Sequence, residues 1–182
     1  MRFNEKSITL KNGQTCLLRS PAEEDAEAML SYLKQTSAET DFMLRYEDEV
    51  VLTPDEERKI LSEILNDPKR IMIAAFINGR LVANTGFSPI GTCERVRHRA
   101  EFGISIIKDF WGLGIGSALL FELIKSAKAT GFEQLELEVV AENERGMALY
   151  KKLGFETFGT RENTFKYRDE HRSACHLMLK KL

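Results

Sequence analysis

Hydrophobic residues recur along the chain with two different periods, and each change of period marks a boundary between structural elements. Apolar segments flank two Asn-Gly pairs, at 12–13 and 78–79, and this arrangement predicts two β-hairpins with tight turns. The segments with strand-like patterns are 8–19, which contains the first turn, 70–77, 80–88, 101–107, 135–140, 155–159 and 173–180. Much of the chain is therefore expected to form one mixed sheet.

Four other segments carry apolar residues at helical spacing. Two of them open with a helix-start signal, Ser-Pro-Ala-Glu at 20–23 and Thr-Pro-Asp-Glu at 53–56, in which the hydroxyl residue is the expected N-cap. We predict helices from these starts to about Gln35 and to before Pro68, a third from Ile115 to Ala127, and a fourth over 143–153. The predicted order is ββ-αα-βββ-α-β-α-ββ, an α/β arrangement with helices on the sheet.

The composition is that of one soluble globular domain. A length of 182 residues suits a single domain with its own core, so we expect one domain over 1–182. Hydrophobic residues make up 43% and charged residues 30% of the chain, which excludes a disordered or fibrous class. The longest apolar run, 71–77, is far shorter than the roughly 20 residues of a membrane helix, and the first residues show no signal-peptide core. We therefore expect a cytoplasmic protein without a membrane partner.

Neither the net charge nor the cysteines point to a special partner. The net charge of -2 provides no overall field for nucleic acid, so no nucleic-acid partner is expected. Cys16, Cys93 and Cys175 are widely separated and form no Cys-x-x-Cys pair, and only three histidines accompany them. We expect neither a disulfide framework nor a metal site.

The strongest chemical signal is a glycine cluster between a predicted strand and a predicted helix: Gly112, Gly114 and Gly116. Glycines at alternate positions leave backbone N–H groups bare at the positive end of the helix dipole, which suits a phosphate. The alternative is that they only make a tight turn. A Rossmann fingerprint needs a third glycine where Ser117 stands, and a P-loop needs a lysine there. Acidic residues about 20 positions further on, Glu136 and Glu138, keep a dinucleotide-binding protein open as an alternative.

Three stretches of the chain resemble one known family. They are EFGISII from Glu101 to Ile107, WGLGIGSALL from Trp111 to Leu120, and Asn143 with ALYKKLGF from Ala148 to Phe155. In this order and separation they resemble the GNAT superfamily of acyl-CoA-dependent N-acyltransferases, over about residues 70 to 160. The resemblance implies a GNAT-like mixed, mostly antiparallel sheet of six to seven strands flanked by about four helices.

The resemblance also implies an activity. A GNAT-type N-acetyltransferase transfers an acetyl group from its co-substrate acetyl-CoA to a primary amine of a small molecule or peptide, by direct attack in a ternary complex. Many proteins of this kind are homodimers. Two alternatives stay open, an acyl-CoA-binding sensor without turnover and a Rossmann-type dinucleotide-binding protein. The identity of the acceptor, and whether the acyl group is acetyl or longer, do not follow from the sequence.

By the same resemblance, the coenzyme binds along the central strand, the glycine loop and the start of the last helix. The residues so implied are Ile104, Ser105, Ile106, Ile107, Trp111, Gly112, Leu113, Gly114, Ile115, Gly116, Ser117 and Asn143. We take the N–H of Ile106 as the oxyanion donor, and Asn143 as both helix cap and coenzyme contact. This chain departs from the family at Trp111 and Leu113, where polar or basic residues are usual, and at Gly146, where alanine is common. The first two departures leave the phosphate site to backbone amides.

Tyr150 and Glu101 are the candidate catalytic residues. An amine with a pKa near 10 is mostly protonated at neutral pH, so the reaction needs a base for the amine and an acid for the leaving thiolate. The resemblance makes Tyr150 the general acid, although helix spacing alone favours a core aromatic packed with Met147 and Leu153. Glu101 is the candidate base, directly or through a water, and His98 is its rival.

The acceptor side is expected outside the matched motifs, around 39–67 and near the last predicted hairpin, 161–172. Segment 41–57 holds seven acidic residues and only one basic residue, Arg45, which suggests a cationic acceptor such as a polyamine, a free amino compound or a peptide amine. Some of these acids alternatively only complement the dipole of the second helix. Basic residues gather at 95–99, where they either meet the 3′-phosphate of the coenzyme or lie in a solvated loop.

Overall fold

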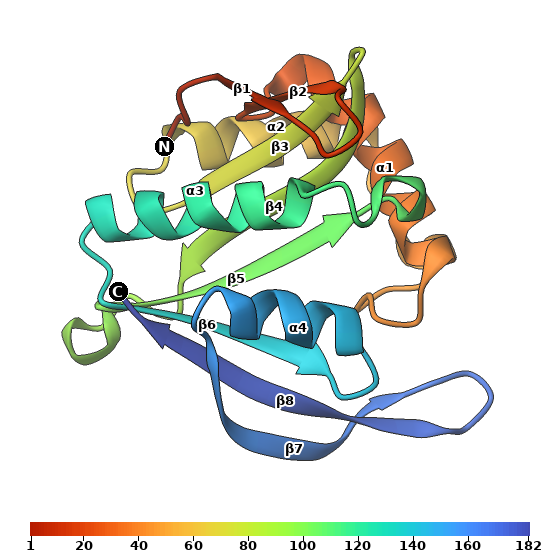
Figure 1. The fold of residues 1–182 in the computed structure, drawn as a ribbon, viewed down its shortest axis with the longest axis vertical. Coiled ribbons are helices and arrows are strands. Elements are labelled where there is room, and N and C mark those ends of the chain that lie inside the picture. Colours follow the sequence, from red (N-terminus) through yellow and green to blue (C-terminus); the bar gives the residue numbers. More distant parts are fainter.

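The computed structural model describes all residues from Met1 to Leu182, and its strands form a single eight-stranded sheet (Figure 1). The strands are β1 (Lys6–Thr9), β2 (Thr15–Arg19), β3 (Ile71–Ile77), β4 (Arg80–Pro89), β5 (Arg99–Ile106), β6 (Gln134–Val140), β7 (Glu156–Lys166) and β8 (Arg172–Lys181). Their spatial order is β1-β2-β3-β4-β5-β6-β8-β7, and every neighbouring pair is antiparallel except β5 and β6. The predicted order of elements is confirmed. The family resemblance implied six to seven strands, whereas the sheet has eight, the number in the predicted order of elements.

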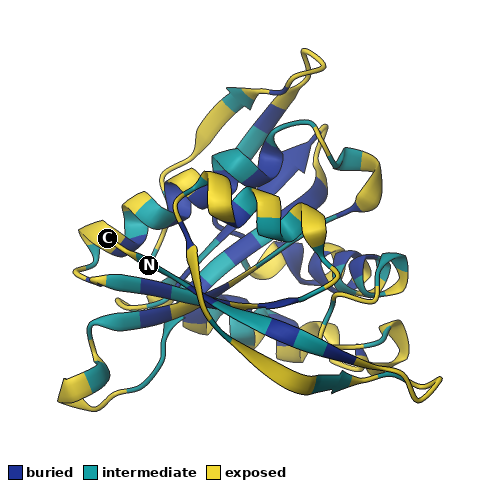
Figure 2. Cartoon of the chain, turned by 60° about the horizontal axis from the view of Figure 1, so that its bottom comes forward, coloured by how far each residue is buried: buried dark blue, intermediate teal, exposed yellow.

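Four α-helices cover the two faces of this sheet (Figures 1 and 2). They are α1 (Ala26–Glu39), α2 (Pro54–Asn66), α3 (Ile115–Ala129) and α4 (Glu144–Lys152). Successive residues of β3 alternate between two apolar clusters: Ile73 packs with residues of α3, and Ala74 packs with Met29 of α1 and Leu61 of α2. Because side chains of a strand alternate between faces, α1 and α2 lie on one face and α3 on the other. None of the helices has the length and apolar character needed to cross a membrane.

The longest apolar run of the sequence is the most deeply buried strand. Six of the seven residues of β3 are buried, because helices cover the sheet on both sides of it. A strand covered on both faces has no polar face, which explains why this segment is continuously apolar rather than alternating. By contrast, β7 lies at the edge of the sheet and is mostly exposed.

Local helix and turn signals outside the N-terminal region are confirmed. The Thr53 hydroxyl accepts a hydrogen bond from the Glu56 N–H (3.3 Å), and the Glu56 carboxylate accepts one from the Thr53 N–H (2.8 Å), so α2 has the predicted capping box. Asn78 and Gly79 have φ angles of 49° and 79°, as a tight hairpin turn between β3 and β4 requires. Gly131, with φ 87°, follows α3 as predicted.

The prediction that Ser20 caps the first helix is wrong. The Ser20 hydroxyl accepts a hydrogen bond from the Phe3 N–H (2.9 Å) and donates one to the Met72 carbonyl (2.9 Å). A partner on β3, 52 residues away, therefore takes the hydroxyl that the local pattern assigned to the helix. This contact ties the end of β2 to the start of β3.

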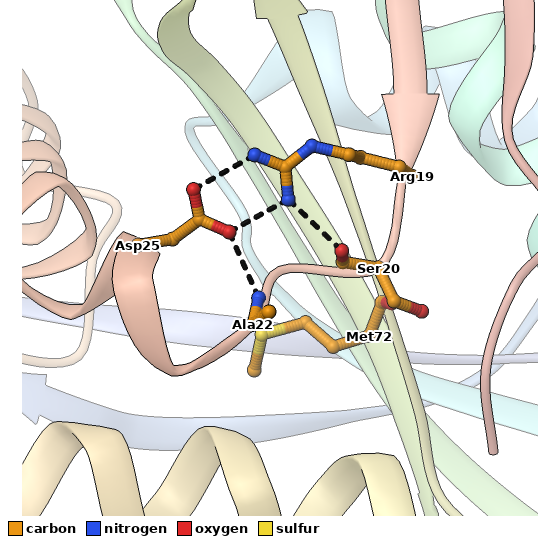
Figure 3. A network of polar contacts seen from close by, with 5 residues as sticks. All are labelled: Arg19, Ser20, Ala22, Asp25 and Met72. Atoms are coloured by element: carbon orange, nitrogen blue, oxygen red, sulfur yellow. Dashed lines mark hydrogen bonds and ion pairs between the residues drawn. The ribbon is translucent and has the colours of Figure 1, made fainter.

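Asp25 holds the turn that leads into α1 (Figure 3). Its carboxylate accepts hydrogen bonds from the Arg19 guanidinium (2.6 and 2.8 Å) and from the Ala22 N–H (2.8 Å). Burial alone would raise the pKa of Asp25, but the hydrogen bonds from Arg19 and Ala22 and the charge of Arg19 outweigh it and lower the pKa. A short 3-10 turn over Glu23–Asp25 occupies the predicted first turn, so α1 begins only at Ala26.

Candidate active site

A gap between two central strands forms the centre of the site. Strands β5 and β6 pair only at their first residues, Arg99–Glu101 with Gln134–Glu136, so the rest of β5 has one free edge. The N–H of Ile107 donates to the Val82 carbonyl on β4 (3.0 Å). Because backbone groups alternate between the two edges of a strand, the N–H groups of Ile104 and Ile106 face the gap. Unpaired N–H groups at this edge are free to bind a ligand.

A cavity of about 1050 Å³ surrounds this gap. Its lining includes Gly116 and Leu149 from the α3 and α4 side and Thr36 and Thr40 from the α1 side, so it extends to both faces of the sheet. The predicted site residues that line it are Ile104, Ser105, Ile106, Trp111, Gly112, Gly114, Gly116, Ser117, Asn143 and Tyr150. The structure thus brings most of the predicted site together.

Three residues predicted to bind the coenzyme do not line the cavity. The side chains of Ile107 and Ile115 are each 1% exposed and pack in the two apolar clusters. Leu113 packs partly against the larger cluster, and its carbonyl accepts a hydrogen bond from the Lys11 N–H (3.2 Å). These side chains hold the strand and the loop in place instead of facing a ligand.

The glycine loop has a backbone that only glycine adopts without strain. Gly112 and Gly114 have φ angles of 80° and 97°, in the left-handed region. At Gly116 an added Cβ would lie 3.0 Å from a methyl group of Leu149 and 3.2 Å from one of Ile106. Helix α3 begins directly after Gly114, and no side chain caps its first N–H groups. Those N–H groups and the helix dipole suit an anion, so the loop fits a phosphate.

Trp111 has a defined place at this loop. Its indole N–H donates a hydrogen bond to the Ile106 carbonyl (2.7 Å), on the free edge of β5. The guanidinium of Arg145, on α4, lies over the indole ring, 4.8 Å from its centroid. The tryptophan therefore joins the central strand to α4.

Asn143 caps α4 and also lines the cavity. Its side-chain oxygen accepts a hydrogen bond from the Gly146 N–H (2.9 Å), which confirms the predicted N-cap. A Cβ on residue 146 would lie only 2.9 to 3.0 Å from the amide group of Asn143. An alanine at 146 would therefore require the Asn143 side chain to shift.

Tyr150 belongs to the core and to the cavity at once. Its ring packs edge-on against Phe102 and Phe155, with centroid distances of 6.0 and 6.2 Å, and its side chain also lines the cavity. The hydroxyl makes no hydrogen bond within the protein. Burial raises the pKa of Tyr150 to about 12, so the phenol stays protonated and can donate a hydrogen bond at neutral pH.

The structure does not support Glu101 or His98 as the base. Glu101 is exposed and lies on the paired part of β5, outside the cavity lining. His98 is also outside the lining, and its carbonyl accepts hydrogen bonds from Glu133 and Gln134. The motif identified the strand correctly, but the place where β5 and β6 separate decides which residue reaches the cavity.

Glu138 is a carboxylate of the cavity wall that the sequence motifs do not identify. It lies on β6 within the cavity lining, and its oxygens accept hydrogen bonds from Arg161 (2.8 and 2.9 Å). The alternation Leu-Glu-Leu-Glu at 135–138 was the available signal, because it puts this carboxylate on the face opposite the buried leucines.

A polar group at the other wall of the cavity was also missed. Asn84 on β4 lies opposite Ser105 on β5, and both line the cavity. The Tyr32 hydroxyl donates to the Ser105 carbonyl (2.7 Å) and contacts the Ser105 hydroxyl (2.5 Å). The side-chain oxygen of Asn84 is buried without a hydrogen-bond partner, so it is ready to accept one from a ligand.

Two distant segments of the predicted acceptor side meet in a contact that we call the clasp. The Arg168 guanidinium binds the Asp48 carboxylate (2.8 Å to each oxygen) and lies 4.0 Å from the centroid of the Tyr46 ring. The Tyr167 hydroxyl donates to the Asp41 carbonyl (3.0 Å). The clasp therefore joins the segment after α1 to the β7–β8 hairpin.

The charged segments are placed differently from the expectation. The residues of segment 41–57 that line the cavity are apolar, namely Phe42, Met43 and Leu44, and none of its seven acidic residues does so. The basic residues of 95–99 also lie outside the lining, and Arg99 pairs with Glu136 (2.5 Å). The predicted acidic rim and phosphate-binding basic loop are therefore not part of the cavity wall.

Known proteins resemble the chain in sequence and in structure. A [Ribosomal protein bS18]-alanine N-acetyltransferase from Haemophilus influenzae is 33% identical to this chain over 91 residues. The matched residues are 50% of this chain and 62% of that enzyme, so the match covers less than two thirds of the relative's length. The crystal structure of an acetyltransferase of the GNAT family from Streptococcus pneumoniae superposes with a TM-score of 0.87 at 31% identity, over 92% of this chain and 99% of that one. A GNAT superfamily phosphinothricin acetyltransferase from Sinorhizobium meliloti, solved in complex with AcCoA, has a TM-score of 0.80 at 21% identity, over 96% and 89% of the two chains.

A sequence profile of the Acetyltransferase (GNAT) family matches residues 21–155, which include β5, the glycine loop and α4. Both the cavity and the loop fit the acetyl-CoA that such enzymes use as co-substrate. The chain therefore belongs to the GNAT family of acetyltransferases.

Proposed function

We propose that the protein acetylates a primary amine at the end of a narrow acceptor, such as a peptide N-terminus or a small amine. The observation that carries the proposal is the cavity through the sheet, with Tyr150 at one side of the gap and Glu138 and Asn84 at the other. In this arrangement an amine and a thioester reach each other between β5 and β6. The Haemophilus influenzae relative, named as acting on an alanine of a ribosomal protein, supports this class of acceptor.

The residues at the gap supply the groups that acetyl transfer needs. The N–H groups of Ile104 and Ile106 are placed to stabilise the negative charge that develops on the carbonyl oxygen. Tyr150 donates a hydrogen bond to the leaving sulfur, because its raised pKa keeps the hydroxyl proton in place. We assign Glu138 as the group that removes a proton from the ammonium form of the acceptor, directly or through a water.

Asn84 completes the acceptor side. Its buried side-chain oxygen lacks a partner and accepts a hydrogen bond from an N–H of the amine, which leaves the nitrogen lone pair free for attack. The cavity wall carries two carboxylates on β6 and directly after it, Glu138 and Glu142. We propose that these, and not the acids of segment 41–57, favour an acceptor that arrives as a cation.

The clasp limits the width of the acceptor. It joins the two segments that border the acceptor side, so an amine must approach on a slender chain. Apolar side chains on the same border, such as Phe42 and Phe165, favour an acceptor with apolar groups near its amine. A lysine in the middle of a folded surface does not fit this approach.

An acetylation panel tests the proposal. It compares a short peptide with a free N-terminal alanine, the same peptide with a blocked N-terminus and one internal lysine, and polyamines of similar length, following thiol release and product mass. We expect turnover of the free N-terminus or of the small amines, and little of the internal lysine. Faster acetylation of the internal lysine contradicts the acceptor class. Coenzyme binding without turnover of any amine supports the sensor alternative. We also propose that the protein forms a homodimer, as many GNAT proteins do, and sedimentation of the same sample tests this.

A further inference from the structure

The glycine loop carries no positive side chain of its own. Residues 111–117 contain neither lysine nor arginine, yet the coenzyme brings a pyrophosphate and a 3′-phosphate, each negatively charged at neutral pH. Backbone N–H groups and one helix dipole offset only part of this charge. The loop therefore needs cations from elsewhere in the fold.

Arg145 is the first of two such cations. It lies in the first turn of α4, lines the cavity, and is held over Trp111, which is itself fixed by the hydrogen bond to Ile106. No carboxylate lies within ion-pair distance of its guanidinium. A stacked arginine keeps its N–H edge free for phosphate oxygens, so the stack presents an unused phosphate-binding group beside the loop.

Lys11 approaches the loop from the other end of the chain. It lies in the turn between β1 and β2, and its N–H donates to the Leu113 carbonyl (3.2 Å). Its side chain passes Gly114, with its Cγ 4.0 Å from where a Cβ would stand on that glycine. Lys11 also lines the cavity and forms no ion pair. The β1–β2 hairpin thus brings a lysine without an ion pair to the glycine loop.

Arg70 is the remaining cation of the cavity lining, and it lies elsewhere. Its carbonyl accepts a hydrogen bond from the N-terminal ammonium of Met1, and the Met1 sulfur contacts Thr130 at the C-terminal end of α3. The glycine loop is at the opposite end of this helix, about 22 Å away for 15 residues at 1.5 Å each. Arg70 is therefore too far from the loop to serve it.

We propose that Arg145 and Lys11 together bind the phosphate groups of the coenzyme, in place of the basic residues that the loop lacks, and that Trp111 is the platform that positions Arg145. The proposal rests on the use of acetyl-CoA as co-substrate, and it adds which side chains recognise its charged half. It makes the phosphates, rather than the pantetheine arm, the part of the co-substrate that these three residues select.

Direct binding and paired kinetics test this proposal. Calorimetry measures the affinity of the intact protein for coenzyme A, and steady-state assays compare acetyl-CoA with acetyl-pantetheine, which has no pyrophosphate. Arg145→Ala and Lys11→Ala are each expected to weaken coenzyme A binding about tenfold, the effect of one lost charge-assisted hydrogen bond. Their kcat/KM with acetyl-pantetheine should stay at the wild-type value, and the salt dependence of coenzyme A binding should become shallower.

A matched variant and two opposing outcomes complete the test. Arg95→Ala removes an exposed arginine outside the cavity, so it should bind coenzyme A like the wild type. Trp111→Leu keeps Arg145 but removes its platform, and should weaken binding of coenzyme A as Arg145→Ala does.

Wild-type affinity in both Arg145→Ala and Lys11→Ala, with unchanged thermal melting, overturns the proposal, and so does an equal loss of kcat/KM with both thioesters. Calorimetry needs no acceptor, so a wrong acceptor class leaves this result unaffected.

Discussion

The coenzyme side and the acceptor side of the cavity are built from different parts of the chain and by different interactions. The coenzyme side comes mainly from one continuous part of the sequence, β5 to α4, and uses backbone N–H groups, glycine conformations and the end of a helix, to which the proposal adds the side chains of Arg145 and Lys11. The acceptor side depends on the clasp, in which side chains about 120 residues apart in sequence meet at the surface. Backbone groups survive changes of side chain, whereas a side-chain contact is lost with one substitution. The backbone part of the coenzyme site is therefore expected to tolerate more substitutions than the side-chain contacts on either side.

The largest effect is expected where the two sides meet, at Tyr150. Tyr150→Phe keeps the ring against Phe102 and Phe155 but removes the hydroxyl, so kcat should fall about a hundredfold while the KM for acetyl-CoA changes little. Because burial raises the pKa of Tyr150 to about 12, the wild-type rate should not fall between pH 7 and 10 through loss of this proton. Steady-state kinetics across that pH range measure both points. An equal loss of turnover and of coenzyme affinity would show that Tyr150 only packs.

The next effect should fall on the acceptor alone. Glu138→Gln is expected to lower kcat/KM for the amine about tenfold to a hundredfold at neutral pH, because the ammonium then loses its proton only to water. The deficit should shrink as the pH approaches the pKa of the amine, where the neutral form is abundant. Glu101→Gln is the control, since Glu101 lies outside the cavity lining. A larger loss in the control than in Glu138→Gln would restore Glu101 as the base.

A smaller effect should appear in the coenzyme loop. Gly114→Ala puts a side chain at φ 97°, a strain of about 1 kcal/mol or more, and should weaken coenzyme A binding about fivefold through a shifted loop. Gly131→Ala imposes comparable strain at φ 87°, after the end of α3 that is distant from the loop, with open space around it. Both variants should melt at lower temperature, but only Gly114→Ala should change the affinity measured by calorimetry. Equal affinities would mean that the loop backbone does not hold the coenzyme.

The smallest effect is expected from opening the clasp. Arg168→Ala removes the contacts to Asp48 and Tyr46, and should raise the relative rate with bulky or internal-lysine acceptors by no more than about fivefold. Coenzyme affinity should not change, since the loop is on the other side. Arg172→Ala, an exposed arginine of the same hairpin without an ion pair, serves as the reference. If Arg168→Ala uses the same acceptors at the same relative rates as the wild type, the clasp does not determine acceptor choice.

The distance along the chain between two interacting residues decides whether the sequence predicts their contact. Signals that depend on neighbours along the chain, such as the Thr53 capping box and the Asn78-Gly79 turn, are found in the structure because their partners lie within three residues. Ser20 carries an equally good local signal, but its hydroxyl bonds to Met72, a partner that only the folded sheet provides.

The candidate site divides in the same way. The glycine loop and Tyr150 follow from motifs, and the structure places both at the cavity. Glu138 and the clasp depend on where β5 and β6 separate and on how a terminal hairpin folds back over the chain. No local sequence pattern encodes these long-range arrangements. The motif therefore pointed to Glu101 as the base, a role that the structure does not support.

The separation of β5 from β6 also affects how the molecule moves. Within the sheet, three residue pairs connect strands β1 to β5 with strands β6 to β8. Outside it, the helices and the clasp join the two halves, which resemble two plates on a short hinge. A ligand lodged between the plates adds contacts to both, and the free protein should flex more about that hinge than the loaded one. The amide protons of Ile104 and Ile106 sit on the open plate edge. Their hydrogen-exchange rates should therefore decrease when a ligand holds the two halves of the sheet together.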